Sequence, residues 1–207
     1  MRYRQPATGF RSGIEPVLLA ASIPAQAGAL VLEGGTGAGA ALLCLAARVP
    51  GLRGFGVEAD PALAAVAAEN LATNGFSGLR IAAGRIEDAA EAGFDHAFAN
   101  PPYHTEASTA SPHPGRRTAK QGVAEGIARW AEALAARLRP GGTLTLILPV
   151  ARLPEAVAAL PASGCGSPAI LPLWPRTGIA AKLVLLRGVR AGRGPLRLLP
   201  GLVLHAA

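Results

Sequence analysis

The chain has 207 residues, 50% of them hydrophobic, and a formal net charge of +7 at pH 7. At this length we expect one domain spanning residues 1–207, and no apolar run approaches the ~20 residues of a membrane span. The first residues lack the apolar core of a signal peptide, and Cys44 and Cys165 make no disulfide framework. These features argue against a membrane or disulfide-rich protein and favour a monomer in the cytoplasm.

Charge is unevenly distributed along the chain. Residues 1–111 hold 7 basic and 10 acidic side chains, a net of −3, whereas residues 112–207 hold 13 basic and 3 acidic ones, a net of +10. This asymmetry suits a polyanionic partner such as a nucleic acid. A GC-rich genome would also favour Arg over Lys, so the high isoelectric point alone indicates little.

Apolar runs alternate with helical patterns in the order typical of a parallel sheet with crossover helices. In the first half we expect strands at 29–32, 52–58, 79–83 and 94–99, and helices at 38–48 and 61–74. Residues 1–28 precede the first strand and would form a cap or substrate segment. Asp60 is suited to cap the second helix, with Pro61 at its first position.

The second half begins with residues 103–118, which predict a long loop because they lack an apolar period. A helix is expected from Ala119 to Arg139, ended by Pro140-Gly141-Gly142. A strand at 143–148, a helix at 154–160, two antiparallel strands at 169–174 and 181–186, and a basic tail at 187–207 follow. The expected fold is α/β and Rossmann-like, mostly parallel, with an antiparallel C-terminal hairpin and helices on both faces.

A glycine loop, residues 33–39, joins the first strand to the first helix, where α/β folds hold nucleotide-type cofactors. Its pattern differs from the dinucleotide fingerprint and lacks the Lys-Ser/Thr ending of a phosphate loop. Glu33 could receive a cationic amino group, and Glu58, ending the second strand, could accept from ribose hydroxyls. The combination of an acid, a glycine loop and a second acid one strand later fits S-adenosylmethionine better than NAD. The alternative is that the glycine loop only packs a strand on a helix.

The NPPY segment, Asn100-Pro101-Pro102-Tyr103, directly follows the expected strand at 94–99. Two prolines fix two φ angles and remove two donors, and Pro101 pushes Asn100 toward an extended conformation. The Asn100 amide oxygen and the Pro101 carbonyl could accept both hydrogens of a planar NH2 group, and Tyr103 could stack on its plane. The bound group would be an adenine amine or a carboxamide. The alternative is that the segment is a Pro-Pro loop with a purely structural role.

With these motifs in place, the chain resembles a class I S-adenosylmethionine-dependent methyltransferase with a seven-stranded sheet. Within that class it resembles the bacterial family that N6-methylates an adenine beside the anticodon of tRNA(Val). The resemblance covers nearly the whole length and includes Gln5 to Gly13, Ala68-Glu69-Asn70, Pro172 to Arg176 and Pro200 to His205. DNA adenine and protein-glutamine methyltransferases share only the NPPY segment.

The resemblance implies that Asn100, Pro101, Pro102 and Tyr103 are catalytic. The implied cofactor contacts are Glu33, Gly34, Gly35, Gly37, Gly39, Glu58, Ala59, Asp88 and Asn100. The chain departs from the family at Glu33 and Glu15, where Asp is usual, and at Arg85, where the family has an Asp that meets the cofactor adenine. Asp88 is the expected substitute.

Methyl transfer would need no metal, and the four histidines show no metal-ligand spacing. RNA contacts are expected from Arg11, Tyr103, Arg116, Arg117 and Lys120, with further basic candidates at Arg2 and Arg4 and in the tail at Arg187, Arg190, Arg193 and Arg197. Two alternatives stay open. One is a protein-glutamine N5-methyltransferase, although only about 28 residues precede the first strand. The other is a catalytically weak methyltransferase-like protein that binds RNA or a partner.

Overall fold

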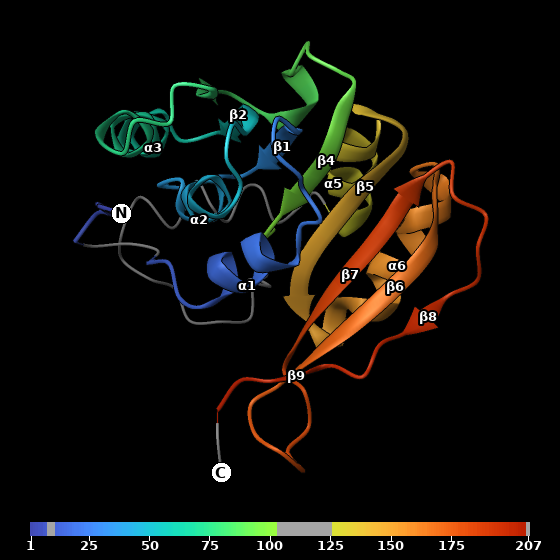
Figure 1. The fold of residues 1–207 in the computed structure, drawn as a ribbon. Helices are drawn as coiled ribbons and strands as arrows, with labels where there is room; N and C mark the ends of the chain where they lie inside the picture. Colours follow the sequence, from blue (N-terminus) through green and yellow to red (C-terminus); the bar gives the residue numbers. More distant parts are fainter. Residues whose placement is uncertain (8–10, 103–125, 206–207) are drawn as a thin grey trace.

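The first half of the chain builds parallel strands whose carboxyl ends meet along one edge of the sheet (Figure 1). The computed structural model describes residues 1–7, 11–102 and 126–205. Within these, the parallel strands are β1 (Leu30–Gly34), β2 (Arg53–Glu58), β3 (Leu79–Ala83), β4 (Phe94–Ala99) and β5 (Leu138–Pro149). We call the edge where these strands end the carboxyl edge.

The C-terminal strands continue the same sheet in a mixed orientation. They are β6 (Cys165–Trp174), β7 (Leu183–Arg190) and the two-residue strands β8 (Arg197–Leu198) and β9 (Leu202–Val203). The order is β3-β2-β1-β4-β5-β7-β6-β8, with β9 also paired to β6. Because β7 runs antiparallel to both β5 and β6, β7 begins and β6 ends at the carboxyl edge. The expected α/β fold, mostly parallel with an antiparallel C-terminal part, is confirmed.

Helices cover both faces of the sheet. The elements are α1 (Glu15–Ser22), α2 (Ala40–Arg48), α3 (Pro61–Thr73), α5 (Ile127–Ala135) and α6 (Leu153–Ala162), with short 3-10 turns η1 (Ile86–Asp88) and η3 (Val150–Arg152). Helices α1, α2 and α3 contribute to one apolar cluster, and α5 and α6 to the other. None of the helices in the described ranges is long and apolar enough to cross a membrane.

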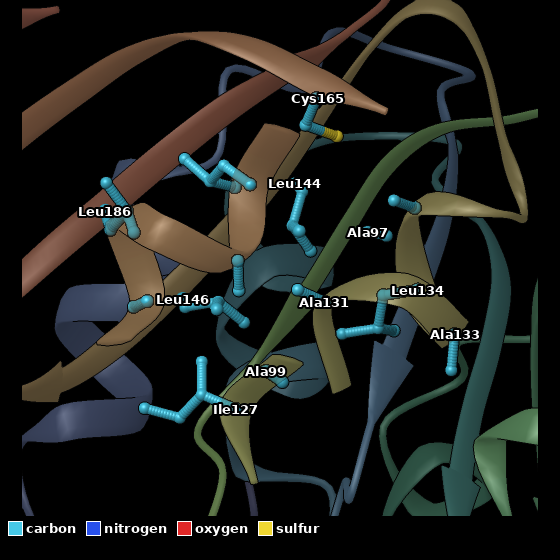
Figure 2. Packing of buried hydrophobic residues seen from close by; sticks show 14 of the residues in the cluster. Ala97, Ala99, Ile127, Ala131, Ala133, Leu134, Leu144, Leu146, Cys165 and Leu186 are labelled. Atoms are coloured by element: carbon cyan, nitrogen blue, oxygen red, sulfur yellow. The ribbon is translucent and has the colours of Figure 1, made fainter. Parts of the chain in front are cut away.

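The alternation along β4 shows how the sequence separates the two layers. Ala97 and Ala99 face α5, while Phe98 points into the opposite cluster. Small side chains on β4 let α5 approach through Ala131, and Leu144 and Leu146 of β5 fill the space beside them (Figure 2). This packing fixes α5 against the strands that lead to the carboxyl edge.

The region between α5 and β5 corrects the sequence prediction. The helix expected to reach Arg139 ends at Ala135, and Leu138 already pairs with Phe94 of β4. Pro140-Gly141-Gly142 lies inside β5, at an irregularity in its pairing with β4, rather than ending a helix. Pairing with β4 therefore outweighed the helical pattern. Residues 119–125 lie outside the described ranges.

Helix α1 was not predicted, and two arginines from other elements hold its C-terminal end. Arg48 of α2 donates to the carbonyls of Ala20 (3.0 Å) and Ile23 (2.5 Å). Arg187 of β7 donates to the carbonyl of Ser22. These side chains satisfy carbonyls that a helix end leaves unpaired, and they hold α1 so that its first residues, Glu15 and Pro16, reach the carboxyl edge.

We expect Arg48→Ala to loosen α1 specifically. The change removes two hydrogen bonds from a charged donor and should lower the free energy of unfolding by about 2 kcal/mol. Backbone amides of α1 should exchange hydrogen faster than those of α3. The control is Arg53→Ala, because Arg53 is exposed and its side chain makes no hydrogen bond within the described residues. Equal exchange in α1 for both variants would contradict this role of Arg48.

Candidate functional site

A cavity of about 710 Å³ opens at the carboxyl edge. The strand register explains why functional groups from separate strands meet there. Gly34 of β1 lies opposite Val57 of β2 and Ala99 of β4, so the next residues, Glu58 and Asn100, emerge on either side of the glycine loop. Glu58 lies opposite Ala83 of β3, which brings the turn after β3 to the same edge. The strand ends contribute Glu33, Gly35, Thr36, Gly37, Ala38, Val57, Glu58, Ala59, Gly84, Arg85, Ile86, Glu87, Asn100, Pro101 and Pro102 to the lining.

Glu33 is a carboxyl group buried in the cavity wall, with 4% of its surface exposed. Its Oε2 accepts from the Thr36 hydroxyl (2.5 Å) and from the Leu42 amide (3.2 Å). Burial raises the pKa of Glu33 to about 8, the two hydrogen bonds oppose the rise, and the charge of Glu58 adds to it. No basic side chain within the described residues pairs with Glu33, so a cationic ligand would favour its ionised form.

The ring of Trp130 on α5 packs against the glycine loop and leaves no room for side chains at two of its positions. A Cβ atom on Gly35 would lie 2.8 Å from Cη2 of Trp130, and one on Gly34 would lie 3.0 Å from Cζ3. Gly37, in contrast, has no heavy atom within 4 Å of the position of a Cβ, so its surface faces open space. Gly34 and Gly39 do not line the cavity: Gly34 packs on Trp130, and Gly39 is the N-cap of α2.

Glu58 connects the second strand to the glycine loop. Its Oε2 accepts from the Gly37 amide (2.8 Å) and its Oε1 accepts from the Asp60 amide (3.0 Å). Each carboxylate oxygen keeps a second acceptor position. The group can therefore hold the loop and still accept from the hydroxyls of a ligand in the cavity.

Asn100 has an unused acceptor at the end of β4. Its Oδ1 atom is buried and has no hydrogen-bond partner within the described residues. Such a group is costly to leave unpaired, and it lines the cavity together with Pro101 and Pro102. The arrangement leaves one buried oxygen available for a donor from a ligand. Tyr103, the last residue of the NPPY segment, lies outside the described residues.

The turn after β3 carries an ion-pair cluster at the cavity wall. Glu87 pairs with Arg129 of α5 (2.8 Å) and lies 3.7 Å from Arg85. Arg85, Ile86 and Glu87 line the cavity, whereas Asp88 is exposed and does not. The acidic group nearest the cavity on this turn is therefore Glu87, one residue before the carboxylate that we expected to contact the cofactor.

The N-terminal segment closes one side of the cavity. Asn70 of α3 and Asn74, the C-cap residue of the same helix, hold it by paired hydrogen bonds to backbone. Asn74 binds the amide (2.8 Å) and carbonyl (2.7 Å) of Arg2, and Asn70 binds the amide (2.9 Å) and carbonyl (2.7 Å) of Arg4. Asn70 also donates to the Ala38 carbonyl of the glycine loop (2.9 Å). Tyr3, Gln5, Pro6, Arg11, Ser12, Gly13, Glu15 and Pro16 complete this side of the lining.

Of the expected substrate contacts, Arg11 lines the cavity, whereas Arg116, Arg117 and Lys120 lie outside the described residues. Sequence reasoning gave no site role to Thr36, Asn70 or Trp130. The spacing of Asn70 and Asn74, one turn apart on a helix, was the available signal for the N-terminal contact. In the described ranges, no group of three or more His, Cys, Asp or Glu side chains could hold a metal ion.

Comparison with protein families identifies the chain. The family profile described as "Methyltransferase small domain" matches residues 15–152, two thirds of the sequence, and the chain belongs to this family. The family and the fold imply S-adenosylmethionine as the cofactor. No curated protein matched the sequence.

Solved methyltransferase structures share the fold. A predicted O-methyltransferase from Agrobacterium tumefaciens superposes with a TM-score of 0.76 at 22% identity, covering 93% of this chain and 88% of that one. TrmN from Thermus thermophilus gives 0.64 at 18% identity, covering 84% and 48% of the two chains. A tRNA (m1A58) methyltransferase, TrmI from Aquifex aeolicus, gives 0.63 at 18% identity, covering 92% and 73%.

We expect Glu33 to make stability fall as pH rises. The folded protein keeps the Glu33 proton up to about pH 8, whereas the unfolded chain releases it near its ordinary pKa of 4.5. The free energy of unfolding should therefore decrease between these values, by on the order of 3 kcal/mol. Urea unfolding at pH 5 and pH 8 should show a smaller decrease for Glu33→Gln than for the wild type. Parallel pH profiles would contradict the raised pKa.

We expect Asn70→Ala to weaken S-adenosylmethionine binding, because it removes hydrogen bonds to both the N-terminal segment and the glycine loop. Loss of a buried donor to Ala38 should weaken affinity about tenfold, measured by calorimetry. Asn74→Ala is the matched control, since Asn74 holds Arg2 but does not contact the loop. Equal affinities for the two variants would show that the contact to Ala38 is unimportant.

Proposed function

We propose that the protein transfers a methyl group from S-adenosylmethionine to the exocyclic amine of an adenine in RNA, most simply in a tRNA anticodon loop. The observation that carries this proposal is the buried, unpartnered Oδ1 of Asn100. It lies in the same cavity as Glu33 and Glu58, the two acids suited to a cationic, ribose-containing cofactor. The group that would hold the methyl acceptor and the groups that would hold the cofactor therefore line the same cavity.

The cavity residues fit the cofactor that the family implies. A cavity of about 710 Å³ is within the size range of small-molecule sites. Glu33 would face the amino group of the cofactor, Glu58 would accept from its ribose hydroxyls, and the open surface of Gly37 would lie against it. When bound, S-adenosylmethionine supplies an electrophilic methyl group on a positively charged sulfur.

Asn100 and Pro101 would position the nucleophile. An adenine amine is weakly nucleophilic because its lone pair is delocalised into the ring, so alignment has to supply much of the rate. Asn100 Oδ1 and the Pro101 carbonyl would accept its two hydrogens, and both oxygens would stabilise the positive charge that develops on nitrogen. Tyr103 would stack on an adenine turned out of its loop.

Charge supports RNA as the source of the adenine. The second half of the chain has a net charge of +10, and the exposed Arg11 lines the cavity mouth. Arg116, Arg117 and Lys120 follow the NPPY segment closely enough in sequence to meet phosphates near a flipped base. The fold alone does not identify the substrate, since the similar structures include both a predicted O-methyltransferase and a tRNA methyltransferase.

The alternative acceptor is a glutamine side chain of a protein. A carboxamide presents the same planar NH2 group, and Asn100 could accept from it equally well. Incubation with labelled S-adenosylmethionine and either total RNA or total protein separates the two functions. Label in the RNA fraction, recovered as N6-methyladenosine, supports the proposal, and label confined to protein overturns it.

We expect Asn100→Ala to lower the rate of methyl transfer at least ~100-fold, because the amine is no longer held in line for attack. Cofactor affinity, measured by calorimetry, should stay close to that of the wild type, since Glu33 and Glu58 are unchanged. Full activity in this variant would show that Asn100 does not position the acceptor.

A further inference from the structure

The loop between β6 and β7, residues 175–182, projects from the carboxyl edge. Strand β6 ends there at Trp174, and β7 begins there at Leu183. Leu183 and its neighbour across the pairing, Pro149, both line the cavity. The loop therefore joins the sheet at the edge where the cavity opens, and Figure 1 shows it extending beyond the paired ends of β6 and β7. It follows the NPPY segment by more than seventy residues in sequence.

This β6–β7 loop presents two cations around an apolar tip. Arg176 and Lys182 are exposed, and within the described residues their side chains make neither an ion pair nor a hydrogen bond. A turn closed by the Ile179 amide and the Arg176 carbonyl (3.1 Å) leaves the Ile179 side chain 52% exposed. The loop thus combines positive charge with exposed apolar surface next to the cavity.

No acidic side chain offsets this charge from the C-terminal part of the chain. Glu155 is the last acidic residue in the sequence, and it is paired with Arg152 (2.8 Å). Residues 156–207 hold six basic residues and none that are acidic. A polyanion approaching this part of the protein therefore meets charges of one sign.

The four arginines of the basic tail lie away from the β6–β7 loop. The sequence alone groups them as candidate RNA contacts, but the structure places them in different environments. Arg187 is half-buried in β7 and donates to Thr145 and Ser22, and Arg190 donates to the Ser163 carbonyl. The turn at Ala191 and Gly192 is held near Gly164, where β6 begins, so Arg193 lies toward the edge opposite the cavity. Arg197 pairs with the middle of β6.

We propose that the β6–β7 loop is a docking site for the phosphate backbone of the RNA whose adenine enters the cavity. This inference rests on the proposed function. Arg176 and Lys182 contact phosphates on the strand next to the flipped base, and Ile179 packs against a ribose or base face. Contacts of this kind fix the position of the RNA rather than reading its sequence.

The test compares two double variants that each remove two positive charges. Arg176→Ala/Lys182→Ala changes the β6–β7 loop, and Arg193→Ala/Arg197→Ala changes exposed cations of the same tail away from the cavity mouth. The probe is bulk unmodified tRNA, with affinity measured over a range of salt concentrations and methyl transfer measured as KM and kcat. Calorimetry with S-adenosylmethionine checks that both variants keep the folded cavity.

The loop variant should raise the Kd and KM for tRNA about tenfold, with kcat at saturating tRNA unchanged. Its slope of log affinity against log salt should be shallower by about 1 to 2, as expected for two lost phosphate contacts. The control variant should stay within about twofold of the wild type. Equal effects of the two variants, or none in the loop variant, would overturn the inference while leaving the proposed function intact. A wild type that methylates protein and not RNA would overturn both.

Discussion

One buried carboxyl group, that of Glu33, organises the rest of the site. It is the penultimate residue of β1, inside the cavity wall, and accepts hydrogen bonds from Thr36, just before α2, and from Leu42 within α2. The glycine loop is thereby folded back over the end of its own strand. The loop then offers the Gly37 amide to Glu58 and the Ala38 carbonyl to Asn70. Glu33, Glu58 and Asn70 therefore hold successive parts of the same loop.

The raised pKa of Glu33 follows from its burial, and it couples the ionisation of this group to the binding of a cation. Burial without a basic partner in the described residues disfavours the ionised form. A cofactor bearing an amino cation would supply the missing charge, so binding and ionisation of Glu33 favour each other. The extra methylene of Glu relative to Asp still places its carboxylate within reach of the glycine loop, as the contact to Thr36 shows.

Local sequence rules predicted strands β1 to β4 and helices α2 and α3 closely, because each strand is apolar and each of these helices has a recognisable start. Asp60 accepts from the amides of Ala62 and Leu63, as its position before Pro61 indicated. The rules were wrong where pairing between distant segments decided the outcome, as at Leu138, which joins β4 instead of continuing a helix. Helix α1 was missed, and its C-terminal end is held by Arg48 and Arg187, which are distant in sequence.

The site was predictable to the extent that it lies at strand ends. Glu33, Glu58 and Asn100 each lie within one residue of a strand end, and the parallel register brings them together. Contacts from helices were not predictable in this way: Trp130 belongs to a helical pattern that indicates only packing, yet it requires glycine at positions 34 and 35. The turn after β3 shows the same limit, since only the structure reveals that Glu87, and not Asp88, lines the cavity.

The sheet topology also explains how acidic and basic surfaces can serve one reaction. The buried or partly buried acids Glu33 and Glu58, which line the cavity, come from β1 and β2, in the half of the chain with net negative charge. The reversal of direction at β7 returns the positive second half to the carboxyl edge, at Lys182 and Leu183. If β7 ran parallel to β5, the β6–β7 connection would have to cross the sheet and would not form a short loop at this edge. The antiparallel strand is therefore what places positive charge beside a cavity built from acids.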